Sequence, residues 1–438
     1  MNLEHSESHA THPKLDVQRT ELPNGLVVLL SEDHATPSVS VNAIVSAGSR
    51  FESDDKAGLA SLTGELLDSG TTTRSSEEIA EMIEAVGGQL NTFGDYQLSG
   101  IALALLSKDL DLGLDVASDV LMNPTFPEHK VREAVGRRVA QTKARLDVPR
   151  TRASDVFNEI VFAGTPQHRP PIGYESTVAT LTRSDVYDFY RRFFSPDNTI
   201  LALVGDIDKD VVKYKLEATF GRWGRAPRPD APAVPRPQRQ TLPIDRFVVA
   251  PKEQANIIVG HVGIERNNPD FYALLVMDTI LGSSPGFTSR IPRVLRDEQG
   301  LAYATFSNIT SSAGLDPGRF IAYIGTAPEN VNRAIGGLKT EIARIVEEGV
   351  TAEELDVAKS YLTGSFVFRF QKNAQVAEFL IECEIYDLGF DFAERYPEVI
   401  RAVTVEDITR VARKYIDPRN LTTVVVAPFD GHKEEGVS

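Results

Sequence analysis

The sequence predicts an α+β protein made of two homologous domains. Helical spacing of apolar residues alternates along the chain with short apolar runs of the kind found in strands. Residues 182–204 align without gaps on residues 404–426, and both segments are predicted to form a helix, a short proline-containing turn and a strand. Such self-similarity over a long separation indicates duplication of a whole domain.

A proline-rich segment separates the two predicted copies. Residues 223–240 contain five prolines without apolar periodicity, which is typical of an extended linker. The predicted organisation is a flexible tail over residues 1–17, a first domain over 18–222, the linker over 223–240 and a second domain over 241–430.

Local patterns place the elements within each domain. The first domain is expected to contain strands within residues 20–30, 38–45, 89–105 and 199–204, and helices at residues 57–71, 75–86, 108–121, 128–146 and 183–194. Ser75 followed by Glu78 matches a capping box at the start of one of these helices. The second domain is expected to contain strands at residues 257–262 and 301–307, a helix at 269–281 and a short helix from Ser289 that ends before Gly300.

The composition excludes several classes of protein. The 438 residues carry a formal net charge of −16, which argues against nucleic acid or an anionic membrane as a partner. No apolar run is long enough to span a bilayer, and the polar first residues contain no apolar leader region. The single cysteine, Cys383, excludes an intrachain disulfide and is expected to be a buried apolar side chain. We therefore expect a cytoplasmic enzyme or enzyme subunit.

Residues 57–71, AGLASLTGELLDSGT, resemble the active-site helix of the pitrilysin–insulinase family of zinc peptidases, which reads roughly G-[LI]-A-H-x-x-E-H-x-L-x-x-G-T. The frame matches, but its three chemical positions do not. Ser61 stands at the first zinc-binding histidine, Gly64 at the glutamate base and Glu65 at the second histidine. The family's third ligand, a glutamate, falls at Gln141 or Thr142. Two histidines at i and i+4 hold the zinc ion and the glutamate activates its water, so the resemblance implies a member without a metal of its own.

A second motif lies in the other predicted domain. Residues 296–303, RDEQGLAY, match the family signature R-[ED]-x-x-G-L-[AS]-Y, and the resemblance as a whole covers residues from about 22 to 428. It implies that Tyr303 donates a hydrogen bond to the oxyanion formed in the reaction and that Arg296 holds a substrate carbonyl. In the family, both residues reach across to the zinc site of the other half of the enzyme. Residues 90–93 resemble the family's edge strand that pairs with an extended peptide.

The resemblance also implies the architecture and the partners. Each domain is expected to be a mixed sheet with helices mainly on one face, and the chain to form half of a clam-shell chamber. The leading hypothesis is a substrate-orienting subunit of a heterodimer, or dimer of heterodimers, that forms a zinc endopeptidase acting on peptides or unfolded segments. Arg296 and Tyr303 would complete the site of an H-x-x-E-H-bearing partner, which would hold the zinc.

Two other functions compete with this hypothesis. The main alternative is a catalytically inactive scaffold or peptide-binding protein of the same fold. A serine hydrolase is disfavoured, because Ser61 has no histidine at helical spacing and no nucleophile elbow around it.

Overall fold

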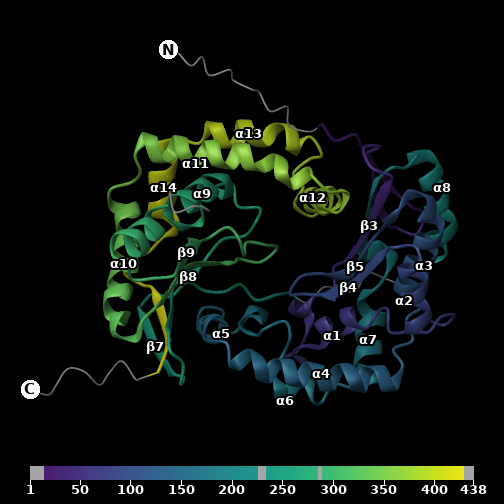
Figure 1. Cartoon of the computed structure of the whole chain (residues 1–438), viewed down its shortest axis with the longest axis horizontal. Helices are drawn as coiled ribbons and strands as arrows, with labels where there is room; N and C mark the ends of the chain where they lie inside the picture. Colours follow the sequence, from purple (N-terminus) through teal and green to yellow (C-terminus); the bar gives the residue numbers. More distant parts are fainter. Residues whose placement is uncertain (1–13, 225–232, 285–288, 429–438) are drawn as a thin grey trace, which may run out of the picture.

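The computed structural model describes residues 14–224, 233–284 and 289–428, and these residues form two lobes (Figure 1). Each lobe contains one mixed sheet with helices, so the predicted α+β class is confirmed. Most of the predicted tail and residues 225–232 of the predicted linker lie outside the described ranges. Within those ranges no helix is long and apolar enough to cross a membrane.

The sheet of the first lobe has the strand order β1-β2-β6-β3-β5-β4. β2 and β6 pair in parallel, whereas the other neighbouring strands pair antiparallel. The bounds are β1 (Val17–Glu21), β2 (Val27–Glu32), β3 (Ser38–Val45), β4 (Gln89–Gly94), β5 (Ser99–Leu106) and β6 (Thr199–Gly205).

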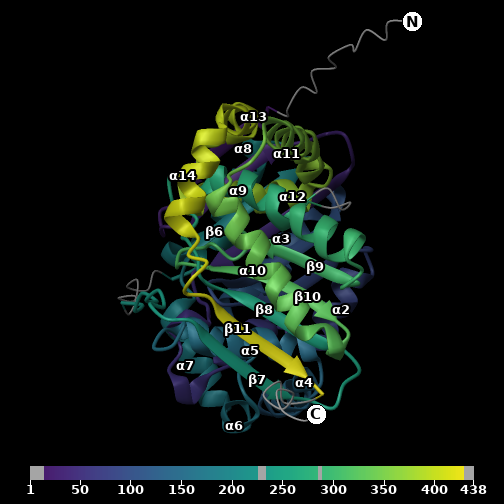
Figure 2. The same ribbon diagram turned by 90° about the vertical axis from the view of Figure 1, so that its left-hand side faces the viewer.

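The sheet of the second lobe repeats this order without the first strand, as β7-β11-β8-β10-β9. Its single parallel pair, β7 with β11, corresponds to β2 with β6. Figure 2 shows β11 and β7 side by side at the outer end of this sheet. The bounds are β7 (Ile244–Val249), β8 (Ala255–Val262), β9 (Ala304–Asn308), β10 (Arg319–Thr326) and β11 (Thr422–Ala427).

Fourteen α-helices are assigned within the described residues. The first half of the chain contributes α1 (Leu59–Glu65), α2 (Ser76–Glu84), α3 (Leu110–Met122), α4 (Glu128–Leu146), α5 (Pro149–Val161), α6 (Glu175–Val178), α7 (Arg183–Phe193) and α8 (Lys209–Thr219). The second half contributes α9 (Phe271–Asp278), α10 (Val331–Glu347), α11 (Ala352–Ser365), α12 (Asn373–Tyr386), α13 (Phe392–Ala402) and α14 (Val405–Tyr415). Two π-helical segments, η7 (Thr279–Ser283) and η8 (Pro292–Glu298), flank the undescribed residues 285–288.

Each sheet buries one face against a helix of the opposite half. Along β6, Leu201 and Leu203 enter the core of the first lobe, whereas Ala202 and Val204 enter the core that contains α12. This split follows from the period of two along a strand. Conversely, α5 packs Phe157 and its apolar neighbours against the second sheet. Because α5 and α12 each pack on the sheet of the opposite half, they join the two lobes through apolar contacts.

The segments that align in the sequence have the same local structure. α7 and α14 both begin with a capping box, formed by Thr182 with Asp185 and by Thr404 with Asp407. In each box the threonine hydroxyl and the aspartate carboxylate satisfy backbone N–H groups that the first helical turn leaves unpaired. β6 and β11 follow these helices at equivalent places in the two sheets.

Three predicted elements differ from the structure. The helix expected over residues 57–71 ends at Glu65, and residues 70–75 form a turn closed by a bridge between Gly70 and Ser75. The strand expected at residues 301–307 begins only at Ala304. The helix expected over 269–281 is α-helical to Asp278 and then π-helical.

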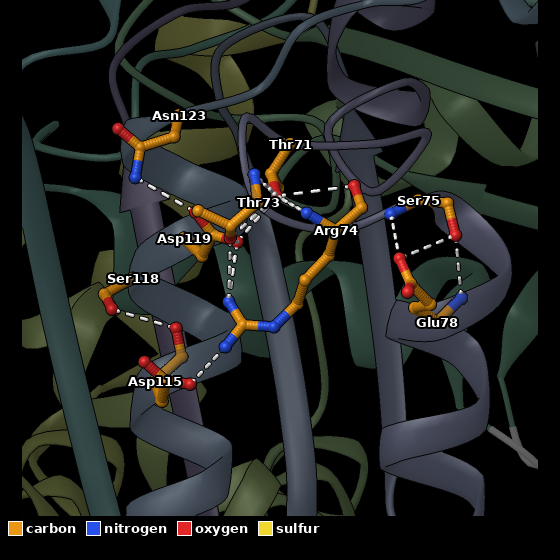
Figure 3. A network of polar contacts seen from close by, with 9 residues as sticks. All are labelled: Thr71, Thr73, Arg74, Ser75, Glu78, Asp115, Ser118, Asp119 and Asn123. Atoms are coloured by element: carbon orange, nitrogen blue, oxygen red, sulfur yellow. Dashed lines mark hydrogen bonds and ion pairs between the residues drawn. The ribbon is translucent and has the colours of Figure 1, made fainter.

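The turn after α1 is tied to α3 by one buried carboxylate (Figure 3). Asp119 accepts hydrogen bonds from the hydroxyls of Thr71 and Thr73 and from Nη1 of Arg74, at 2.6, 2.7 and 2.7 Å. Burial alone would raise the pKa of Asp119, but these bonds and one from Asn123 lower it. The carboxylate therefore stays charged and fixes the turn that positions α1.

Candidate functional site

Helix α1 presents two polar side chains on one face. Ser61 and Glu65 are four residues apart and therefore neighbours on the helix, while Leu62 and Gly64 are buried against the lobe. Both polar side chains face α4. The resemblance matches these two positions to the family's two zinc-binding histidines.

Arg138 of α4 directs its guanidinium at both of them. Its Nη1 donates to the Ser61 Oγ over 2.7 Å, and its Nη2 donates to a carboxylate oxygen of Glu65. Arg137 donates to the other oxygen of Glu65 over 3.1 Å. The Arg138 side chain is only 8% exposed. A fixed positive charge therefore lies between the two positions.

These residues do not fit a zinc ion. Zinc in proteins takes nitrogen, sulfur or carboxylate ligands, whereas Ser61 offers a neutral hydroxyl and Glu65 a carboxylate already bonded to two arginines. Gln141 is exposed, and the buried Thr142 donates its hydroxyl to the carbonyl of Val139 over 2.8 Å. Within the described residues no three histidine, cysteine, aspartate or glutamate side chains gather as a metal-binding group. The guanidinium would also repel a second cation.

Gly64 lies where α1 crosses strand β4. A Cβ on Gly64 would come 2.2 Å from the carbonyl oxygen of Phe93, and a Cβ on Gly94 would come 2.4 Å from the carbonyl oxygen of Ala60. The two glycines thus allow the backbones of the helix and the strand to touch. A glutamate at position 64, where the family has its catalytic base, has no room in this structure.

A carboxyl group fixes the start of α1. Glu52 accepts a hydrogen bond from the N–H of Gly58 over 3.1 Å and another from the N–H of Ala60. Desolvation raises the pKa of Glu52 to about 8, although these two bonds and the nearby Arg169 and Arg138 act in the opposite direction. Arg138 thus interacts electrostatically with Glu52 at the start of this short helix and bonds to Glu65 at its end.

The edge strand predicted at residues 90–93 lies within β4, at one end of the first sheet. Among the described strands β4 pairs only with β5, so its outer edge has unpaired backbone groups. A pocket of about 660 Å³ opens beside this edge, and its lining includes Leu90, Asn91, Asp68, Lys130 and Arg137. Burial raises the pKa of Asp68 in this wall. The pocket lies between the start of β4 and helix α2.

The Arg/Tyr signature lies in the other lobe, around the end of η8. The positive φ of 63° at Gly300 ends the helix, and Leu301 donates its N–H to the carbonyl of Leu295 over 2.8 Å. Thr326 donates its hydroxyl to the carbonyl of Leu301 over 2.6 Å. Tyr303 follows this fixed turn and is 87% exposed.

Within this chain, Arg296 and Tyr303 lie in a different lobe from Ser61 and Glu65 of α1. Arg296 lies on η8 and is partly buried, and Tyr303 directly precedes the edge strand β9. β9 belongs to the left lobe in Figure 1, whereas α1 belongs to the right lobe.

Two family models match the chain. Residues 27–170 match the model described as insulinase (peptidase family M16), and residues 180–362 match the model described as peptidase M16 inactive domain. A zinc protease of Mycobacterium tuberculosis, itself uncharacterized, is 30% identical over 406 residues, covering 92% of this chain and 91% of the relative. The chain belongs to the insulinase family, peptidase family M16.

Other relatives of the M16 family agree in sequence and in fold. An uncharacterized zinc protease of Streptomyces coelicolor is 29% identical over 416 residues, covering 93% of this chain and 89% of that protein. The crystal structure of a peptidase M16 inactive domain from Pseudomonas fluorescens superposes with a TM-score of 0.88 at 22% identity, covering 96% of this chain and 100% of that one. A protease from Helicobacter pylori has the same TM-score at 20% identity, with 94% and 100% covered. These two structures establish the fold of the M16 chain.

Sequence reasoning missed Arg138, the residue that occupies the degenerate site. A signal for it was present in the pattern of α4. The buried positions of that helix are Val131, Ala134, Arg138 and Thr142, which follow one another at steps of three and four residues. An arginine on such a stripe requires a partner, because charged side chains are almost never buried unpaired.

Proposed function

We propose that this M16 chain is the substrate-orienting subunit of a heterodimeric, cytoplasmic zinc endopeptidase. Its partner would be a homologous chain that carries H-x-x-E-H and the zinc, and its substrates peptides or unfolded segments. The observation that carries the proposal is the contrast between the two sites. Arg138 bonds to Ser61 and Glu65, the residues that the resemblance matches to the family's zinc-binding histidines, whereas Tyr303 is exposed on a fixed turn.

The proposed roles follow from the chemistry of the two side chains. A tyrosine hydroxyl can donate a hydrogen bond to the oxygen on which negative charge develops when a peptide carbonyl is attacked, and a guanidinium can hold the carbonyl of a neighbouring peptide unit. Such donors accelerate a reaction when they are positioned in advance. The helix end at Gly300 and the bond from Thr326 to Leu301 supply that rigidity for Tyr303. The partner's zinc would polarise the same carbonyl.

The open edge of β4 supports a role in peptide binding. An extended peptide can add to an exposed sheet edge through backbone hydrogen bonds, which gives affinity without a strict sequence requirement. The pocket beside Leu90 and Asn91 would take side chains of such a peptide. The same feature is compatible with the alternative function, an inactive scaffold or peptide-binding protein.

Reconstitution separates these functions. The chain and an H-x-x-E-H homologue encoded by the same genome are purified separately, and cleavage of a fluorogenic peptide and bound zinc are measured for each chain and for the mixture. Activity that arises or increases strongly only in the mixture, with zinc in the partner, is the expected result. Stable association or peptide binding without any gain in activity would favour the alternative, and zinc-dependent activity of this chain alone would refute the proposal.

A further inference from the structure

A second pocket lies where the two lobes meet. This seam pocket has a volume of about 430 Å³, and its lining includes Asp95, Gln97, Asn158, Phe162, Arg169 and Arg319. Its walls come from the turn between β4 and β5, from α5 and the segment after it, and from the loop between β9 and β10. Both lobes therefore contribute to it.

The walls of the seam pocket are held in place by polar contacts between the lobes. Arg50 forms two bonds with the carboxylate of Asp316, at 3.0 and 2.8 Å, and Tyr96 donates its hydroxyl to the same carboxylate over 2.8 Å. The side-chain oxygen of Gln97 accepts the N–H of Leu315 over 2.9 Å. A pocket with such walls exists before any ligand arrives.

Arg319, at the start of β10, places a partly buried guanidinium in this wall. Its Nη1 donates to the Ser154 hydroxyl over 2.8 Å and to the Asn158 side-chain oxygen over 2.5 Å. Both acceptors are neutral. Within the described residues no carboxylate forms an ion pair with Arg319, and the nearby Asp155 is bound by Arg145 at 2.6 and 3.0 Å. Burial lowers the pKa of Arg319, although the charge of Asp155 partly opposes this.

Among the described residues, the four fully buried arginines each have a carboxylate partner, whereas the partly buried Arg319 has none. Arg138 pairs with Glu65, Arg169 with Asp54, Arg266 with Glu382 and Arg290 with Glu354. This difference matters because a cation withdrawn from water without a counter-ion is costly. A charge that is unpaired in the free protein and lines a preformed pocket is what an anionic ligand would require.

We propose that the seam pocket binds a carboxylate group through Arg319. A guanidinium and a carboxylate match in shape and form two parallel hydrogen bonds, and Phe162 and Pro171 offer apolar surface to the carbon skeleton that bears the carboxylate. Asp95, exposed at the pocket wall, disfavours a doubly charged group such as phosphate.

The place of the pocket indicates where this carboxylate comes from. The wall residues 95–97 directly follow Gly94, the last residue of the edge strand β4. A peptide lying along β4 would therefore reach the seam pocket with an acidic side chain or with its terminal carboxylate. This assignment of the carboxylate to a peptide rests on the proposed function, whereas the carboxylate site itself does not.

Calorimetric titration of the full chain tests the proposal without a partner or zinc. The probes are acetyl-Ala-Ala-Phe with a free terminal carboxylate, the same peptide as its amide, and acetyl-Ala-Asp-Ala amide. We expect at least one acidic probe to bind with 1:1 stoichiometry, and the neutral amide at least tenfold more weakly. The acidic probe that binds more tightly identifies the source as a peptide terminus or a side chain. Equal binding of the acid and its amide, or no binding of either acidic probe, would overturn the proposal.

Variants assign the binding to this pocket. Arg319→Gln should weaken binding of the acidic probe at least tenfold. Arg222→Gln removes an exposed arginine outside the pocket and should leave the affinity for this probe unchanged. Asp95 lies on an exposed turn, and Asp95→Asn should increase the affinity for the same probe severalfold, because a charge that repels the carboxylate is removed. An affinity that is insensitive to both Arg319→Gln and Asp95→Asn would place the probe elsewhere and refute the assignment. Because no peptidase activity enters these titrations, their outcome is independent of whether the heterodimer is active.

Discussion

The guanidinium of Arg138 donates to the hydroxyl of Ser61 over 2.7 Å, at the position where the family binds zinc through a histidine. Its second nitrogen bonds to Glu65, at the position of the other histidine. A side-chain cation thus lies between the two positions that the resemblance matches to the family's metal ligands, and it joins α1 to α4. In this chain, Ser61 and Glu65 are therefore held by an internal polar network with Arg138.

This ion pair should contribute to stability. Removing one member of a buried pair typically costs about 3–5 kcal/mol. Because the Glu65 side chain is 33% exposed and retains its bond to Arg137, we expect Arg138→Ala to lower the free energy of unfolding by only about 1–3 kcal/mol. Urea denaturation measures this difference.

Arg137→Ala is the matched control for Arg138→Ala. It removes the neighbouring arginine, whose side chain is 57% exposed, from the same carboxylate. Exposed ion pairs contribute about 0.2–1 kcal/mol, so this variant should be close to wild type. Equal losses in the two variants would contradict the structural role assigned to Arg138.

Gly64 should not tolerate a side chain. A Cβ at this position would overlap the carbonyl of Phe93, so we expect Gly64→Ala to lower the free energy of unfolding by about 1–3 kcal/mol or more. Gly136 provides the control, since it lies inside helix α4 with no atom within 4 Å of an added Cβ. Gly136→Ala should raise stability by about 0.4–1 kcal/mol. A neutral or stabilising Gly64→Ala would mean that α1 and β4 are less closely packed than described.

Elements with strong local signals were predicted with nearly correct bounds. α4 spans Glu128–Leu146 as expected, because Pro127 precedes a regular apolar stripe. The capping boxes of α2, α7 and α14 fix their starts in the same local way. Such features depend on residues three or four positions apart, which a single sequence displays.

Features that depend on distant contacts could not be predicted in this way. The packing of α5 on the second sheet depends on apolar residues of the other lobe, such as Val424. The bond between Arg138 and Ser61 joins residues 77 positions apart. The family resemblance directed attention to Ser61 and Glu65, but the bonds that join both residues to Arg138 become visible only in the three-dimensional structure.

Glu52 should make stability depend on pH. Its pKa is raised from 4.5 to about 8 in the folded chain, chiefly by desolvation, so the folded state binds a proton that the unfolded state has lost between these values. The free energy of unfolding should therefore fall as the pH rises from about 4.5 to 8. Urea denaturation at pH 5, 6.5 and 8 measures the slope. Glu52→Gln cannot titrate and should flatten it, whereas an unchanged slope would assign the pH dependence to other groups.

Tyr303→Phe tests the role proposed for the exposed tyrosine. In the reconstituted heterodimer, loss of one hydrogen-bond donor to a developing oxyanion should lower kcat by about 10²–10³-fold, with a smaller effect on KM. The phenol is 87% exposed and the variant keeps the ring, so folding and association should be unchanged. Tyr214→Phe, on α8 with 73% exposure, removes a comparable hydroxyl from the first lobe and should retain full activity. If Tyr303→Phe also retained full activity, the oxyanion would have to be stabilised by the partner's own groups, and this chain would contribute binding surface alone.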